Sequence, residues 1–484
     1  MKPLHRACLA SLILALVFSG CLVQPDRHEY ASVRRAAFPA PEPGRGTPGG
    51  GRLPVPGEPV DVARAVAIAL ANNPDAAMAT ERIRRSAAMT AQARAAFMPM
   101  VSVYGEYVQG NAPSGYLFKT MDQRLLAPQV NFNDPGWFEN WEAGASARVN
   151  LFSGGSQWLG YRMARKGEAA ARLSRGEVRN TLSATVVEAF YNVLAAGEAR
   201  DIARQSRDTV DRQLSIMRVR FEGGGALKSD ILSLEVREAQ AKEDLVRAEN
   251  SRSLALAALA NLLGFSPDTD LVLNQDEPMA TDFPEGYEAG LPLALAKRPE
   301  LAAARLAVER SAMAVDAARA AYLPRVDGQA KVYVDDPNAD FNWDRRNWTV
   351  GAVVNWELWA GGVRSARVEE ARAVLAEMLA GDEKATQGVM LDVKSAYLNL
   401  GAARARCPVT RASVAQAEES LRLVKTQYEG GSATVSRYLD AELAAHRARM
   451  AAANAFYDRM KARADLARAL GLFAPDTEGG LPHE

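Results

Sequence analysis

The hydrophobic pattern of this chain has a helical period over two very long stretches. Between residues 178 and 193, apolar side chains recur every three or four residues, which places them along one side of a helix. The stripe consists of Val178, Leu182, Val186, Ala189 and Val193, and it recurs 207 residues later as Ala385, Val389, Val393, Ala396 and Leu400. No proline occurs from 156 to 221, so we expect a helix of roughly 65 residues, about 100 Å long at about 1.5 Å per residue.

The pattern changes from a helical period to alternation in the segments that precede each long helix. In 326–334, apolar or small residues alternate with Asp327, Gln329 and Lys331, which is typical of a strand with one polar face. The other segments of this kind are 348–356 and, with weaker alternation, 101–107 and 143–152. We therefore expect two amphipathic β-hairpins.

Prolines mark the ends of the shorter helices. Short helices are expected at 61–71 and 291–297. Each is followed by a helix of about 25 residues that ends near Pro99 or Pro324, because proline cannot continue a helix.

Glycines mark the far ends of the long helices. After each glycine-rich turn, a returning helix is expected to run to Leu263 or Leu470. Pro408 lies inside the second long helix, 363–428, where we expect a kink or a local break. Each half of the chain is thus a β-hairpin followed by a very long helical hairpin.

One unit is repeated along the chain. Pro74 corresponds to Pro299 at an offset of 225, and Trp141 corresponds to Trp348 at an offset of 207. Two offsets that persist over roughly 200 residues indicate internal duplication. The difference of 18 residues falls between Pro99 and Trp141, so the first repeat has the longer loop there. The expected segments are a first repeat at 60–280, a second repeat at 281–473 and a C-terminal tail at 474–484.

The first 59 residues have the features of export rather than of a folded domain. Two basic residues precede an apolar run from Leu9 to Phe18, and small residues before Cys21 resemble a bacterial lipobox, in which the cysteine becomes lipidated. The alternative is an ordinary signal peptide with an incidental cysteine. We expect a lipoprotein signal at 1–20, and a lipid anchor with a proline- and glycine-rich tether at 21–59.

Composition excludes several classes of function. The chain has 58 basic and 58 acidic residues, so no net charge favours nucleic acid as a partner. Its three cysteines and four histidines are scattered, and we expect no metal site and no cofactor. No paired carboxylates or catalytic triad stand out, so we do not expect an enzyme.

Four predicted strands cannot form a closed barrel within one chain. Each is about ten residues long, as tilted membrane strands are, and an open sheet edge is not viable in lipid. Two chains would give eight strands around a filled interior, whereas three would give twelve strands around a lumen. Aromatic residues crowd the strand ends, as in the girdles of membrane barrels: Trp137, Phe138, Trp141, Trp343, Trp348, Trp356 and Trp359.

The repeated strand–helix order, the glycine-rich turns and the lipobox together resemble the TolC-type outer-membrane factors, over nearly all of residues 60–473. The resemblance is greater to the lipidated members. It implies a mostly α fold with a membrane β-barrel portion, in which a homotrimer forms a twelve-stranded barrel that continues as a periplasmic helical barrel. It also implies the exit duct of a tripartite efflux or secretion system in the outer membrane, with a periplasmic adaptor protein, an inner-membrane pump and outer-membrane lipid as partners.

The resemblance places the functional residues at the two glycine-rich turns, which in the family meet the adaptor and close the pore. Asp230 and Asp440 match the acidic residues of the constriction, and Arg437 stands where many members have another aspartate. The adaptor-contacting residues would be Gly224, Gly225, Ala226, Leu227, Gly431, Ser432, Ala433 and Thr434. The alternative is that both aspartates are helix-start residues favoured by the helix dipole, and that Arg437 and Asp440 form a surface pair.

Two interpretations of function stay open at this point. One is a passive export duct that is opened by an adaptor. The other is a periplasmic coiled-coil scaffold whose β segments are soluble. The lipobox favours small molecules as cargo, by family likeness only, and the sequence does not distinguish drugs, metal ions and secreted protein.

Overall fold

The computed structural model describes residue 34, residues 58–274 and residues 282–474. The expected signal segment, Cys21, nearly all of the tether and all but the first residue of the C-terminal tail lie outside the described residues. Two compact units make up the described chain, and each draws residues from both expected repeats. One unit contains the β-sheet, and the other contains most of the long helices.

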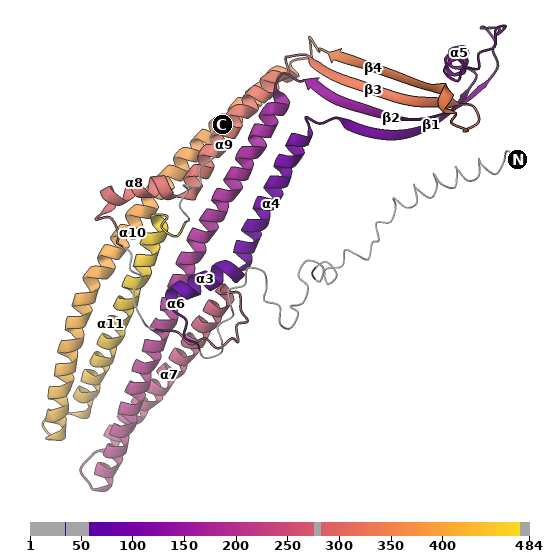
Figure 1. Ribbon diagram of the computed structural model, residues 1–484. Helices are drawn as coiled ribbons and strands as arrows, with labels where there is room; N and C mark the ends of the chain where they lie inside the picture. Colours follow the sequence, from indigo (N-terminus) through magenta and orange to yellow (C-terminus); the bar gives the residue numbers. More distant parts are fainter. Residues whose placement is uncertain (1–33, 35–57, 275–281, 475–484) are drawn as a thin grey trace. The chain divides into compact units, whose positions relative to one another are not determined.

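A four-stranded antiparallel sheet dominates the first unit (Figure 1). In spatial order its strands are β1 (Met100–Gly110), β2 (Phe138–Phe152), β3 (Arg325–Asp336) and β4 (Arg346–Asn355). The strands are mostly longer than predicted, although β4 ends just before Trp356. The connection between β1 and β2 contains the helix α5 (Pro113–Asp122), whereas the connection between β3 and β4 contains only the short 3₁₀ turn η2 (Trp343–Arg345).

The strand register gives the sheet one polar and one apolar face, because successive side chains along a strand point to opposite sides. The polar face includes Ser102, Tyr104, Glu142, Ser146, Lys331, Asp335 and Thr349. The apolar face includes Val101, Val103, Ala145, Leu151, Val332, Trp348 and Val350. Large side chains of the apolar face are open to solvent in the single chain: Val103 is 85% exposed and Val350 is 73% exposed.

One aromatic residue departs from the expected girdle. Phe138 is buried on the polar side of the sheet, where its ring lies beside Gly115 of α5. The tryptophans near the strand ends are mostly exposed, as Trp137 and Trp343 illustrate. Phe138 therefore holds α5 rather than extending the exposed aromatic set.

The helices have nearly the predicted bounds. They are α3 (Val62–Asn72), α4 (Pro74–Ala95), α6 (Ser156–Glu222), α7 (Lys228–Leu262), α8 (Tyr287–Lys297), α9 (Pro299–Ala320), α10 (Val363–Glu429) and α11 (Val435–Ala469). Both α6 and α10 contain 67 residues, which confirms the two very long helices. The helix expected at 291–297 begins earlier, at Tyr287, and contains Pro292. Across the described ranges, we find no helix with the length and apolar character needed to cross a membrane.

Of the two outcomes expected at Pro408, a kink or a local break, the local break is wrong. α10 runs without interruption from Val363 to Glu429, with Pro408 inside it. The proline is exposed, so the carbonyl of Arg404, which loses its helical hydrogen bond, lies on a side of the helix that water can reach. The helix therefore loses one hydrogen bond without burying an unpaired polar group.

Both predicted stripes pack into cores of the helical unit. In the first stripe, Leu182, Val186 and Val193 are buried, and they pack with residues of α3, α7 and α11. In the second, Val389, Val393, Ala396 and Leu400 are buried among residues of α8, α9 and α11. The narrow apolar face of each long helix is thus covered by shorter helices and by α11.

Candidate functional site

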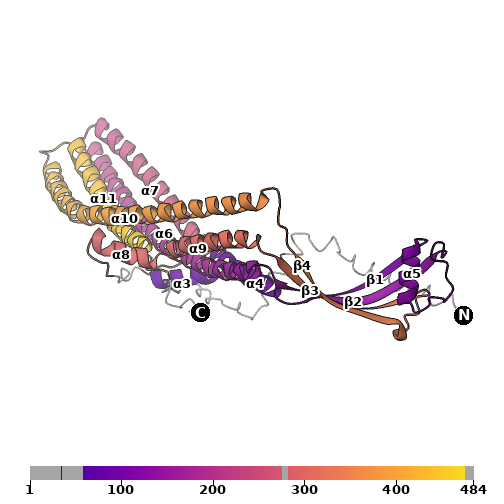
Figure 2. The ribbon, with the colours of Figure 1, turned by 90° about the horizontal axis from the view of Figure 1, so that it is seen from above.

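The candidate site comprises the turns that join α6 to α7 and α10 to α11. Figures 1 and 2 show both turns at the same end of the helical unit. Residues near both turns share one hydrophobic cluster, which includes Leu214 and Met217 of α6, Leu234 of α7 and Val435 of α11. The two expected tips are therefore brought together within one chain.

The first turn depends on a single glycine in the left-handed region. Gly224 has a φ of 76°, whereas the φ of the neighbouring Gly225 is not positive. The backbone N–H of Gly225 donates to the carbonyl of Arg220 at 2.8 Å, which closes the end of α6. The conformation of Gly224 allows this closure, because side chains with a Cβ rarely adopt it.

Asp230 takes the helix-start position that the sequence offered as an alternative. Its carboxylate accepts a hydrogen bond from the backbone N–H of Leu227 at 3.3 Å, at the beginning of α7. The side chain is half-buried, and its charge acts on the nearby Tyr428. Helix capping and a role at the tip are compatible, since the carboxylate retains acceptor capacity.

The second turn has the same construction with a different cap. Gly431 has a φ of 78°, and the backbone N–H of Ser432 donates to the carbonyl of Gln427 at 2.8 Å. The hydroxyl of Thr434 accepts from the backbone N–H of Arg437 at 3.3 Å and begins α11. Thr434 is therefore a structural cap as well as a candidate contact residue.

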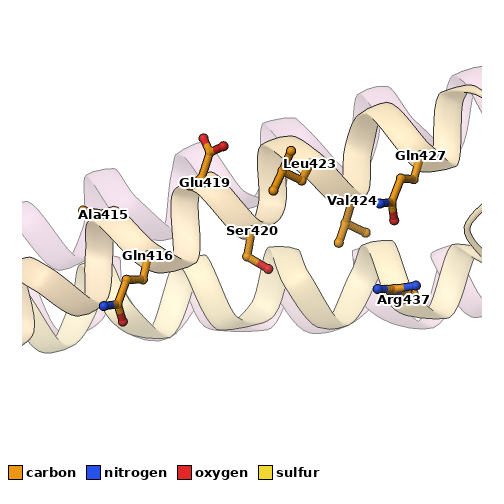
Figure 3. Close-up of a pocket in the computed structure, with 8 residues that line it drawn as sticks. All are labelled: Ala415, Gln416, Glu419, Ser420, Leu423, Val424, Gln427 and Arg437. Atoms are coloured by element: carbon orange, nitrogen blue, oxygen red, sulfur yellow. The ribbon is translucent and has the colours of Figure 1, made fainter.

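Arg437 and Asp440 do not pair. Across the described chain, no ion pair joins Arg437 to either Asp440 or Asp230, so the predicted surface pair is absent from the single chain. Both residues are exposed. Arg437 lines a groove of about 570 Å³ between α11 and α10, beside Val424 and Gln427 (Figure 3). Arg437 and Asp440 thus lie about one turn apart on α11, whereas Asp230 lies at the start of α7, and no ion pair joins the three proposed gate residues in the described chain.

An aromatic pair that the sequence analysis did not select lies between the turns. The rings of Tyr428 and Tyr438 stack with centroids 5.3 Å apart, and the guanidinium of Arg220 lies 5.5 Å from the centre of the Tyr428 ring. The hydroxyl of Tyr428 also donates to the sulfur of Met217, at 3.9 Å. Burial raises the pKa of Tyr438 to about 12, so this phenol stays neutral. Tyr428 therefore connects the second hairpin to the end of α6.

A buried carboxylate near the turns was also missed. Glu442 on α11 is 5% exposed and accepts hydrogen bonds from Ser206 of α6 at 3.0 Å and Arg237 of α7 at 3.2 Å. The sequence contained a signal for it, because Glu442 falls at helical spacing among the buried residues Tyr438 and Ala445. A charged side chain in an apolar stripe is buried only when it is paired.

Comparison with solved structures identifies the fold. A membrane protein from Pseudomonas aeruginosa matches with a TM-score of 0.76 at 22% identity, covering 84% of this chain and 90% of that protein. The outer membrane protein VceC from Vibrio cholerae matches with a TM-score of 0.72 at 19% identity, covering 85% of this chain and 96% of that protein. The described elements therefore have the fold of these membrane proteins.

Sequence comparison gives relatives along most of the chain. The pyoverdine export outer membrane protein OpmQ of Pseudomonas aeruginosa is 25% identical over 411 residues, which cover 83% of each chain. The alkaline protease secretion protein AprF of the same species is 25% identical over 410 residues, which cover 82% of each chain. The family model described as outer membrane efflux protein matches residues 65–265 and 290–472. This chain belongs to the outer membrane efflux protein family.

Proposed function

We propose that three copies of this chain form an outer-membrane channel that serves as the exit duct of a tripartite efflux or secretion system. The observation that carries the proposal is the sheet with one polar and one apolar face, whose strands β1 and β4 are edge strands in the described chain. An unpaired edge is not viable in lipid, so another chain must pair with it.

The exposures of the two faces support a barrel with a water-filled interior. Val103, Trp348 and Val350 lie on the apolar face and are 85%, 70% and 73% exposed, so they would contact lipid. Hydroxyl, amide and charged groups of the other face would line the lumen. Three chains supply twelve strands, enough for an open interior, whereas eight strands leave room only for side chains.

The helical tips are the proposed gate. Threefold symmetry would convert Asp230, Arg437 and Asp440 into rings of charge at the tips of the helical hairpins. Arg437 and Asp440 are exposed and form no ion pair in the described chain, so both are available to groups on neighbouring chains. Pairs between chains would favour the closed arrangement.

The same tips are the proposed contact for the periplasmic adaptor, which connects the duct to an inner-membrane pump. The contact residues would be Gly224, Gly225, Ala226, Leu227, Gly431, Ser432, Ala433 and Thr434, of which all but Ala226 and Ala433 are exposed. Cys21 would carry lipid and hold the mature chain at the outer membrane. The relatives are named for pyoverdine export and for alkaline protease secretion, so the proposal includes both efflux and secretion.

The proposal is tested on the full chain purified from outer membranes in mild detergent. We expect a mass of three chains and discrete conductance steps in planar bilayers. A monomer that remains in the periplasmic fraction and gives no conductance would contradict the duct and favour the coiled-coil scaffold. Labelled palmitate on the wild type but not on Cys21→Ala would support the lipid anchor.

A further inference from the structure

The longer loop of the first repeat folds into a helix that has no counterpart in the second repeat. Residues 111–137 separate β1 from β2 and contain α5, whereas residues 337–345 separate β3 from β4. α5 adjoins the end of the sheet at which both hairpins turn (Figure 1). The opposite ends of the strands lead along the chain to the long helices α6 and α10.

Buried polar contacts attach α5 to the sheet. The ammonium of Lys119 donates to Glu142 on β2 at 2.7 Å and to Asp335 on β3 at 3.0 Å. These two carboxylates are 4% and 0% exposed. The side-chain amide of Gln123 donates to Asn140 at 2.8 Å, and Asn140 donates to Asp335 at 2.6 Å. Lys119 is thus the cation that joins the helix to two adjacent strands.

Contacts at both sides of Lys119 fix the position of the helix. The ring of Phe138 lies so close to Gly115 that a Cβ at that glycine would approach it to 2.7 Å. The side-chain amide of Asn347 on β4 donates to the carbonyl of Asp122 at 3.2 Å. α5 therefore reaches from β2 to β4 and cannot be a loop that projects freely from the sheet.

The register decides which face α5 covers. Glu142 pairs with Asp335, and side chains two and four residues from this pair include Tyr333, Lys331 and Ser146, all on the polar face. Lys119 of α5 binds Glu142 and Asp335 themselves, so α5 covers the polar side. This inference rests on the proposed function, in which that side is the lumen and the hairpin turns lie at the outer mouth.

We propose that α5 lies inside the lumen, where three copies narrow the outer mouth of the duct, and that Lys119 is the residue that positions them. Phe118 and Met121 are 64% and 51% exposed, and they occur at helical spacing on the side of α5 away from Lys119 and Gln123. They would form an apolar collar that limits the size of solutes passing the mouth.

The test uses thiol labelling on intact cells, which does not depend on the state of the periplasmic tips. The parent carries Cys407→Ser, and Ser102→Cys places a reporter on the polar face away from α5. The control reporter is the neighbouring Val103→Cys on the apolar face. A small membrane-impermeant maleimide and a bulky polymer-linked maleimide are added from outside, and their labelling rates are compared.

We expect the small reagent to label Ser102→Cys and the bulky reagent to label it slowly. Lys119→Met, or a glycine–serine linker in place of Pro113–Asp122, should raise the bulky-reagent rate several-fold without changing the small-reagent rate. Lys119→Arg retains the positive charge, so in this variant the bulky reagent should label Ser102→Cys as slowly as it does in the parent. If Lys119→Met fails to fold, the linker variant still tests the inference. It removes α5 altogether and places no methionine beside the carboxylates of Glu142 and Asp335.

Two results would overturn the inference, and they are distinguishable. An unchanged bulky-reagent rate in both the Lys119→Met and linker variants would show that α5 does not narrow the mouth, while the duct itself stands. Failure of the small reagent to reach Ser102→Cys in any background would show that the polar face is not a lumen open to the outside. The second result would overturn the proposed function together with this inference.

Discussion

The carboxylate of Glu442 on α11 accepts a hydrogen bond from the guanidinium of Arg237 on α7 at 3.2 Å, and both side chains are largely closed off from solvent. Because Ser206 of α6 binds the same carboxylate, one residue of the second helical hairpin contacts both helices of the first. A rearrangement that separates the hairpins at this level must break these contacts. The ion pair therefore couples the two hairpins close to the proposed gate.

Removing one partner of this pair should destabilise the helical unit more than removing both. Glu442→Leu leaves Arg237 buried without its partner, and such losses cost about 3–5 kcal/mol, whereas an apolar pair of similar volume is often neutral. We expect the double variant Glu442→Leu with Arg237→Met to recover most of the loss. Hydrogen exchange of α7 and α11 amides provides the measurement, and additive effects of the two changes would contradict the coupling.

His446 should make stability depend on pH. It faces Glu442, Arg237, Asp244 and Arg449, and burial lowers its pKa despite the opposing effect of Glu442. Below the ordinary value of about 6.5, the unfolded chain therefore binds a proton more readily than the folded chain, so stability falls as pH decreases.

The variant His446→Gln isolates this contribution. Its thermal midpoint should fall less than that of the wild type between about pH 6.5 and about pH 5, because glutamine has no proton to bind in this range. Thermal unfolding of both proteins in matched buffers gives the comparison. Parallel midpoint curves for the two proteins would show that His446 does not contribute to the slope.

The charged residues at the proposed gate should control conductance rather than stability. Asp440→Ala, and to a greater extent Asp440→Ala with Arg437→Ala, should raise single-channel conductance in planar bilayers while the trimer stays intact. Pairs of this kind are worth about 0–1 kcal/mol when exposed, enough to shift a closed-to-open equilibrium several-fold. Glu419→Ala is the control, since this exposed carboxylate pairs with Arg422 on the same helix.

Two adjacent glycines of the first turn should respond differently to substitution. Gly224→Val should be strained, because φ at this position is 76°, whereas Gly225→Ala should be tolerated. The cost at Gly224 is about 1–2 kcal/mol, and it should appear as weaker adaptor cross-linking with the trimer preserved. Equal adaptor binding by both variants would show that the turn conformation is not needed for docking.

The two faces of β4 should differ in their tolerance of charge. Val350→Lys places an ammonium on the apolar face, where lysine near the middle of a bilayer costs about 2–4 kcal/mol. Thr349→Lys places the same charge on the polar face and should be accepted. The yield of trimer in outer-membrane fractions measures the difference, and similar yields would argue against a lipid-facing surface.

The sequence by itself determined the local elements. Helical spacing, alternation and the positions of glycine act within a few residues, so α6, α10, the amphipathic strands and the turn at Gly431 follow from them directly. Asp230 at the start of α7 belongs to the same class, because a helix cap is a contact between neighbours in sequence.

Only the tertiary structure decided which polar residues are buried and which face α5 covers. Lys119 and Asp335 are 216 residues apart in sequence, and Ser206 and Glu442 are 236 apart. Periodicity within a segment does not identify partners at such distances, and the same helical pattern is compatible with either side of a sheet. Pro408 is a further case that the sequence did not decide. The helix continues through it because this side of α10 is open to water, and the packing of the neighbouring helices determines which side that is.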